Sequence, residues 1–299
     1  MKILLSASLM ILFIATNMQA QRFDEVVIEP HKITDQIYLL KGAGGNIVIL
    51  TGDEGTLMID SQFGDISEKI KATIADITDH PVKYLVNTHW HGDHTGGNLN
   101  FSNDGSTIIA HDNVRARVSK DLTRPFRGVT PALNKAAWPT ITFGEDLSIY
   151  MNGKQIELLH MHNAHTDGDA FVIFPEDNVI HMGDIFFKDR FPFIDLDTGG
   201  SVDGYIGALE AALLIIDDET TIVPGHGNIA RKDDLTRFLA MIKTVQERTI
   251  EQIKISEEDA TLDHAELTED YESWGDGFIN SEKFIRTLQT DYSRKKEEK

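Results

Sequence analysis

One short stretch of the sequence concentrates residues that could bind metal ions. Positions 88–94 read Thr-His-Trp-His-Gly-Asp-His, so three histidines and one aspartate lie close together. A hydrophobic core does not explain such a run, because a buried imidazole needs a polar partner. Imidazole nitrogens and carboxylate oxygens that converge from one loop are typical ligands of zinc and related cations. The stretch therefore predicts a metal site, with the candidate ligands His89, His91, Asp93 and His94.

Three further candidate ligands occur later in the chain, each shortly after a predicted strand. They are His165, Asp184 and His226. Each is a weak signal alone, because a single histidine is commonly a hydrogen-bonded structural residue and a single aspartate is commonly a cap. Together they place ligand types at several strand ends, where loops usually carry the functional residues of a fold. We therefore expect them to complete the metal site.

Short apolar runs alternate with turn signals and predict a mixed α/β fold. Strands are expected at 37–40, 47–50, 57–59, 82–86, 107–110, 155–159, 170–174, 179–180 and 221–223. Helices are expected at 67–79, 113–120, 202–216 and 233–255, and residues 121–139, which contain three prolines, are expected to form a loop with a short helix. The strands fall into two halves, 26–150 and 151–232. This arrangement predicts an αββα sandwich of two mixed β-sheets flanked by helices.

The N-terminus has the pattern of a secretory signal peptide. Lys2 precedes an apolar run over residues 3–15, which is short for a membrane span, and Ala20 offers a small residue for cleavage. We therefore expect residues 1–20 to be removed. The mature chain is expected to be periplasmic or secreted, with no membrane anchor after cleavage.

Composition narrows the class of function further. The chain has 28 Lys+Arg against 48 Asp+Glu, a formal net charge of -20, which argues against nucleic acid and favours a small-molecule substrate. It has no cysteine, which removes thiol nucleophiles, cysteine metal ligands and disulfides. Residues 21–299 are expected to form a single domain with a helical C-terminal segment from about residue 233 to residue 299.

The candidate residues together resemble the five signature stretches of the metallo-β-lactamase superfamily. These stretches are Asp60 after the strand 57–59, the run 89–94, His165, Gly183-Asp184 and Gly225-His226-Gly227, in that order. The resemblance implies two zinc ions per chain. It assigns His89, His91 and His165 to the first ion, Asp93, His94 and His226 to the second, Asp184 to a bridge between them, and Asp60 to support of the ligand loop.

The resemblance also implies a reaction. Residues 21–299 would be an exported metallo-hydrolase domain in which a hydroxide bridging two zinc ions attacks the carbonyl of an ester, thioester, lactone or amide. Asp93 would orient the hydroxide or pass on its proton. One alternative is a β-lactamase, although the best-known zinc β-lactamases carry cysteine where this chain has Asp184. An alternative of another class is a mononuclear iron persulfide dioxygenase, which uses part of the same ligand set.

The sequence also offers a candidate substrate contact. A chain with net charge -20 repels anions at long range, so a substrate with a carboxylate would need a local cation. Lys188, four residues after Asp184, is the nearest in sequence, and Arg190 is the reserve. His160 and His162 are further candidates for the cleft. Aromatic residues that could form pocket walls, or equally the core, are Phe126, Trp138, Phe186, Phe187, Phe191 and Phe193.

Overall fold

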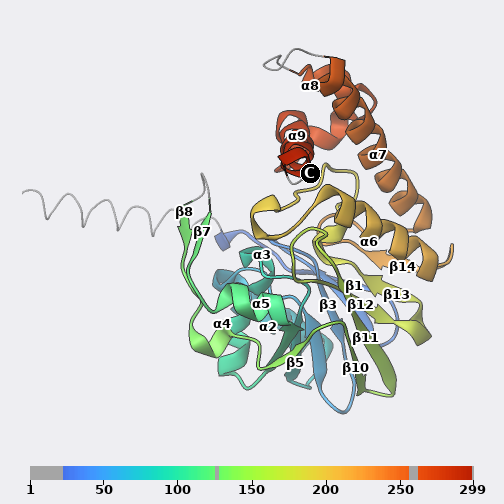
Figure 1. The fold of residues 1–299 in the computed structure, drawn as a ribbon. Coiled ribbons are helices and arrows are strands. Elements are labelled where there is room, and N and C mark those ends of the chain that lie inside the picture. Colours follow the sequence, from blue (N-terminus) through green and yellow to red (C-terminus); the bar gives the residue numbers. More distant parts are fainter. Residues whose placement is uncertain (1–22, 125–127, 256–261, 298–299) are drawn as a thin grey trace, which may run out of the picture.

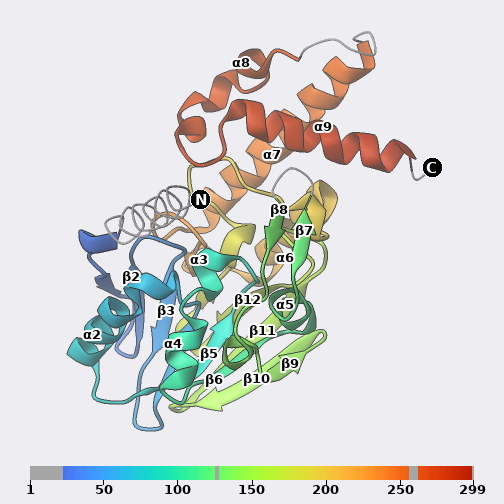
Figure 2. The same ribbon diagram turned by 90° about the vertical axis from the view of Figure 1, so that its left-hand side faces the viewer.

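A computed structural model describes residues 23–124, 128–255 and 262–297. The predicted signal peptide, residues 1–20, and Phe126 lie outside the described residues. Two β-sheets pack face to face, and helices cover the outer side of each sheet (Figure 1 and Figure 2). The predicted αββα sandwich is therefore confirmed.

The first sheet has seven strands in the order β1-β2-β3-β4-β5-β6-β9. The strands from β1 to β4 pair antiparallel, and the strands from β4 to β9 pair parallel. The parallel strands end at the same edge of the sheet, so the loops that follow them lie together there. The strand bounds are β1 Glu29–Lys32, β2 Ile37–Lys41, β3 Ile47–Leu50, β4 Thr56–Ile59, β5 Val82–Asn87, β6 Thr107–His111 and β9 Ile141–Phe143.

The second sheet has five strands in the order β10-β11-β12-β13-β14, of which only the last pair is parallel. Its first strand corrects our division of the chain, because the sequence pattern places residues 146–150 in the first half. They pair with β11 through a hairpin whose turn residues Asn152 and Gly153 both have positive φ, the geometry that suits a two-residue hairpin turn. The strand bounds are β10 Asp146–Met151, β11 Lys154–Met161, β12 Asp169–Phe174, β13 Val179–His181 and β14 Thr221–Val223.

The core has a layer between the sheets and a layer under the helices of each sheet. Between the sheets, residues such as Val48 and Val172 pack together in one cluster. On the outer side of the first sheet, Ile70 and Ile74 of α2 lie on the buried stripe that the helical spacing predicts. The helices beside the first sheet are α2 Ser67–Ile77, α3 Gly92–Thr95, α4 Asn98–Asn103 and α5 Asp112–Val118.

The helices beside the second sheet include the C-terminal segment. Tyr205, Phe238 and Phe284, from α6, α7 and α9, belong to one buried cluster with residues of that sheet. Figure 1 shows α8 and α9 beyond one end of the sandwich. The helix bounds are α6 Val202–Ile215, α7 Lys232–Ile255, α8 His264–Leu267 and α9 Ser281–Glu297. No helix in the described ranges is both long and apolar enough to cross a membrane.

Some short elements differ from the sequence expectation. β1 is exposed along its whole length and contains a proline, so it lacks an apolar pattern. In the predicted loop 121–139, β7 (Leu122–Arg124) and β8 (Gly128–Thr130) form a small antiparallel pair. Short 3-10 turns connect the main elements, namely η1 Gly64–Ile66, η2 Lys135–Ala137, η3 Pro175–Asp177, η4 Gly183–Ile185, η5 Leu196–Thr198 and η6 Glu269–Asp276.

Candidate metal centre

The predicted ligands converge at one end of the two sheets. The run 89–94 follows β5 and continues into α3, which places four ligands on one strand-to-helix turn. His165 lies between β11 and β12, Asp184 lies in η4 after β13, and His226 follows β14. The ligand atoms form two groups, each with its atoms within 4.8 Å of one another: His89, His91, His165 and Asp184, and Asp93, His94 and His226.

Asp184 lies between the two groups, with one carboxylate oxygen turned to each. Its Oδ2 lies 3.8 Å from His89 Nε2 and 3.6 Å from His165 Nε2. Its Oδ1 lies 3.1 Å from His94 Nε2 and 3.5 Å from His226 Nε2. This is the arrangement expected of a carboxylate shared by two cations.

Gly225 permits the close approach of Asp184 to the loop that carries His226. A Cβ added at Gly225 would lie 2.0 Å from Asp184 Oδ1, so a larger residue would displace the carboxylate. Gly227, on the other side of His226, has φ +110°, a conformation that favours glycine. The Gly-His-Gly motif therefore reflects local geometry as well as the ligand itself.

Several buried polar atoms in the centre fit a bound metal. His89 Nε2, His94 Nε2 and Asp184 Oδ1 are buried and make no hydrogen bond with any part of the chain that is described. Leaving such atoms unpaired is unfavourable, by roughly 1–3 kcal/mol for each group. The three atoms face the interior of the centre, where cations would take them as ligands. The two groups therefore fit a dinuclear metal site.

Asp60 contacts the second group through His94. Its side chain is fully buried, and its Oδ2 accepts a 2.7 Å hydrogen bond from His94 Nδ1. The same carboxylate accepts hydrogen bonds from the backbone N–H and the hydroxyl of Thr88, at 2.8 Å and 2.7 Å. Since Nδ1 of His94 is engaged by Asp60, Nε2 is the ring nitrogen left to bind a metal ion.

The imidazoles of the first group are oriented in the same way. His165 Nδ1 donates to the carbonyl oxygen of Phe193 at 2.7 Å, and His91 Nε2 donates to Asp195 Oδ2 at 3.0 Å. The two remaining nitrogens, His91 Nδ1 and His165 Nε2, lie 2.8 Å apart. With both donors already used, two lone pairs face each other, an arrangement that a shared cation stabilises.

Asp195 is a functional residue that sequence reasoning missed. Its carboxylate is buried and also lies 3.5 Å from Arg124 Nη1, while the Arg124 guanidinium lies over the Trp90 ring at 5.3 Å. Burial raises the pKa of Asp195, but the hydrogen bond and charge of His91 outweigh this and lower it. No sequence motif links Asp195 to His91, which lies more than a hundred positions earlier in the chain.

The charges of the ligand residues favour positive charge at the centre. Burial lowers the pKa of His226, but Asp184 and Asp93 outweigh this and raise it to about 9. Burial raises the pKa of Asp93, but His94 and His226 outweigh this and lower it to about 2. At neutral pH Asp93 is therefore ionised and the His226 imidazole is protonated, and a metal ion would displace that proton.

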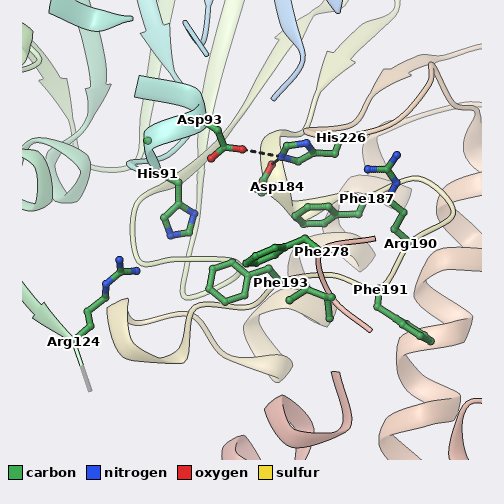
Figure 3. Close-up of a pocket in the computed structure, with 12 residues that line it drawn as sticks. His91, Asp93, Arg124, Asp184, Phe187, Arg190, Phe191, Phe193, His226 and Phe278 are labelled. Carbon is green, nitrogen blue, oxygen red and sulfur yellow. Dashed lines mark ion pairs between the residues drawn. The ribbon is translucent and has the colours of Figure 1, made fainter. Parts of the chain in front are cut away.

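A cavity of about 300 Å³ opens over the centre. Figure 3 shows the ligands His91, Asp93 and His226 on one side and aromatic residues facing them. Of the predicted wall residues, Phe187, Phe191 and Phe193 line this cavity. Phe186 instead belongs to the core, and Trp138 packs in a cluster with Trp90.

Lys188, the predicted substrate contact, does not line this cavity. Its ammonium donates to Asp234 Oδ2 and to the carbonyl oxygen of Ile229, each at 3.0 Å. The reserve candidate, Arg190, does line the cavity. Of the two candidate cations, Arg190 therefore faces this cavity, whereas Lys188 is held by the carboxylate of Asp234 in α7.

The two other candidate cleft residues also lie outside the cavity lining. His160 stacks on His111, with ring centroids 3.7 Å apart and an interplanar angle of 11°. His162 is exposed and lies 3.1 Å from Glu145. His160 therefore contacts the end of β6 in the first sheet, and His162 contacts the turn that precedes the second sheet.

Comparison with known proteins places the chain in a family. The family model described as Metallo-beta-lactamase superfamily matches residues 40–226, which include all seven candidate ligands. A metallo-β-lactamase from Pontibacter korlensis matches with a TM-score of 0.60 at 18% identity, over 72% of this chain and 99% of that one. A double mutant of the sec-alkyl sulfatase PisA1 matches with a TM-score of 0.63 at 15% identity, over 92% of this chain and 51% of that one. These solved structures show the fold.

Curated relatives share parts of the sequence. The 2,4-dinitroanisole O-demethylase subunit alpha of Nocardioides sp. (strain JS1661) is 29% identical over 46% of this chain and 40% of its own length. The coenzyme F420H(2) oxidase of Methanothermobacter marburgensis is 22% identical over 81% of this chain and 57% of its own length. The chain therefore spans about half the length of these two relatives. The hydroxyacylglutathione hydrolase GloC of Haemophilus influenzae is 25% identical over 61% of this chain and 85% of its own length. With the family model covering most of the chain and the site geometry in agreement, the chain belongs to the metallo-β-lactamase superfamily.

Proposed function

We propose that this chain is an exported, dinuclear zinc hydrolase that cleaves an ester, thioester, lactone or amide. The observation that carries the proposal is the position of Asp184, whose two oxygens face two separate groups of ligands. A mononuclear iron site would need only one of these groups. Three imidazoles around one position and a mixed set of imidazole and carboxylate around the other suit zinc. Export is supported by the pattern of residues 1–20.

Two zinc ions on these ligands would supply a Lewis acid and lower the pKa of water in the cavity towards neutrality. The chain supplies the orientation. Asp93 is the more exposed of the two cavity-lining carboxylates, at 28% against 6% for Asp184, and its Oδ2 lies 3.2 Å from His226 Nε2. As a carboxylate at the edge of the cavity, Asp93 can accept a hydrogen bond from water and orient that water.

The proposed reaction adds one water molecule across the scissile bond. The oxygen of water forms a bond with the carbonyl carbon, the bond from that carbon to the leaving oxygen, sulfur or nitrogen breaks, and a proton from water reaches the leaving group. No cysteine is available as a nucleophile, in agreement with direct attack by water. Asp93 is placed to guide the proton, because it borders both the cavity and His226.

The identity of residue 184 favours a broader hydrolase over a β-lactamase. An aspartate here provides the shared carboxylate, whereas the best-known zinc β-lactamases carry cysteine at this point. A thioester substrate is favoured by the match to GloC, which is named a hydroxyacylglutathione hydrolase and is covered over 85% of its length. The β-lactamases among the solved structures share 18% identity, so they support the fold alone.

A substrate panel on the zinc-loaded chain 21–299 tests the proposal. Nitrocefin, acyl thioesters, lactones and phosphodiesters would be compared at equal concentration, before chelation, after chelation and after zinc is restored. We expect cleavage of a thioester, ester or lactone that is lost on chelation and regained with zinc. Cleavage of nitrocefin alone would make the chain a β-lactamase. Cleavage of phosphodiesters alone, or oxygen uptake with a persulfide by iron-loaded protein, would overturn the proposal.

A further inference from the structure

Two hollows meet at the metal centre and differ in character. The cavity of about 300 Å³ over the ligands has an apolar side built from Phe187, Phe193, Phe278 and Ile279. A second hollow of about 400 Å³ is lined mainly by polar and charged residues and by the glycine-rich loop 42–44. The two share His226 and Arg190, so a ligand that reaches from one to the other passes the candidate ligands.

The apolar side depends on the C-terminal segment. Phe278 lies between η6 and α9, beyond the region that the family model matches, and its side chain is 71% exposed. Its ring meets that of Phe193 edge-on at 6.2 Å, and Figure 3 shows both rings opposite His91. An exposed aromatic ring at the mouth of a cavity gains free energy when an apolar ligand covers it.

The polar hollow carries two cations that lack acidic partners. Arg190 and Lys41 both line it, and neither forms an ion pair with any residue in the described ranges. Lys41 Nζ instead donates to Asn228 Oδ1 at 2.6 Å. Lys188 and Asp189 also line this hollow, but each already has a partner of opposite charge: Lys188 Nζ lies 3.0 Å from Asp234 Oδ2, and Asp189 Oδ1 lies 3.2 Å from Arg237 Nη2. In a chain with net charge -20, two unpaired cations beside the metal centre favour an anion.

We propose that the substrate is an amphiphilic acid: an apolar, preferably aromatic, group lies on Phe278 and Phe193, and an anionic group binds Arg190 and Lys41. This inference rests on the proposed function, since it places the scissile carbonyl between these two contacts. A carboxylate suits the arginine, because its planar guanidinium donates two parallel hydrogen bonds. The reaction remains the addition of water described above, and the two contacts decide which compound is held for it.

Binding of acids that are not hydrolysed tests the inference without turnover. The zinc-loaded chain 21–299 would be titrated by calorimetry with benzylsuccinate, methylsuccinate and 3-phenylpropionate. The first probe has a ring and two carboxylates, the second lacks the ring, and the third lacks the second carboxylate. We expect benzylsuccinate to bind most tightly, with an affinity that falls as salt is raised.

Variants separate the two contacts. In each probe zinc would take one carboxylate, so only benzylsuccinate and methylsuccinate have a second carboxylate for the two cations. Arg190→Ala and Lys41→Ala should each weaken these two probes by roughly ten-fold, because a charge-assisted hydrogen bond is lost, and should leave 3-phenylpropionate unchanged. Phe278→Ala should weaken the two ring-bearing probes by about two- to ten-fold and leave methylsuccinate unchanged. Arg190→Lys should restore part of the loss. Lys243→Ala on α7 and Tyr150→Ala on β10, an exposed cation and an exposed aromatic outside both hollows, serve as matched controls.

Each outcome decides one claim. The inference would be overturned if each probe bound wild type, Arg190→Ala and Phe278→Ala with the same affinity. This holds even if the substrate panel shows hydrolysis. The expected binding pattern together with a failed substrate panel would overturn the proposed function and leave the ligand class standing.

Discussion

Residues on the two walls of the metal cavity differ in how deeply they are buried. On the ligand wall, His94 and His165 are fully buried, and each has its second ring nitrogen fixed by a hydrogen bond of 2.7 Å. On the facing wall, Phe278 is 71% exposed and comes from a segment after the family match. We infer from this difference that the ligands at the strand ends determine the reaction, whereas the connecting and C-terminal segments determine which substrate binds.

Removing the shared carboxylate should break the ligand wall most severely. Asp184→Asn removes a negative charge that faces both ligand groups, and we expect the affinity for at least one zinc ion to fall by ten-fold or more. Hydrolysis should fall with it. Zinc titration against a competing chelator measures the loss, and Asp53→Asn, at an exposed carboxylate near β4, serves as the control. Full metal content and full rate in Asp184→Asn would show that this residue is not shared between two ions.

The two supporting carboxylates should act on different ions. Asp60→Asn removes the acceptor of His94 Nδ1 and should weaken the second site, whereas Asp195→Asn removes the acceptor of His91 Nε2 and should weaken the first. Each loss is expected at roughly ten- to a hundred-fold in affinity. Asparagine tolerates the positive φ of 62° at position 60, so the backbone is preserved.

Cobalt substitution can separate the two sites, because its absorption reports the ligand set of each bound ion. Asp197→Asn, two residues after Asp195 and paired with Arg294, is the matched control. Weakening of the same site by both variants, or an equal loss of metal binding in Asp197→Asn and Asp195→Asn, would contradict these roles.

The smallest effect is expected at Lys188. Because its ammonium is held by Asp234 and by a backbone carbonyl, Lys188→Ala should leave KM unchanged and lower the free energy of unfolding by about 1 kcal/mol or less. Arg190→Ala, only two residues away, should raise KM for an anionic substrate. Steady-state kinetics and urea denaturation of both variants check the contrast. A larger rise in KM for Lys188→Ala than for Arg190→Ala would reverse our assignment of the two cations.

The ligand wall could be predicted from the sequence because its residues follow strands. His89 to His94 lie on a single turn, so their proximity needs no knowledge of the tertiary fold. His165, Asp184 and His226 can be found because apolar runs mark the strands before them. The sandwich follows from the same runs, although they place β10 in the wrong half. Its polar–apolar alternation (DLSIYM) lacks the continuous apolar run of the buried strands.

The facing wall could not be predicted in the same way. Phe278 and Arg190 approach the cavity from segments without a metal motif, and their positions depend on how the C-terminal helices pack against α6 and α7. Asp195 escapes sequence reasoning for a similar reason, since only tertiary structure brings its turn to His91. Sequence distance alone favours Lys188 over Arg190, but side-chain direction and the presence of Asp234 decide between them.

Metal content measures the central claim most directly. Chain 21–299, purified without chelators and exchanged into metal-free buffer, would be analysed for zinc, iron and manganese per mole of protein. We expect close to two zinc ions per chain, and a fall towards one or none in Asp184→Asn. A wild-type chain that holds a single iron ion, or no metal after incubation with zinc, would contradict the dinuclear zinc centre.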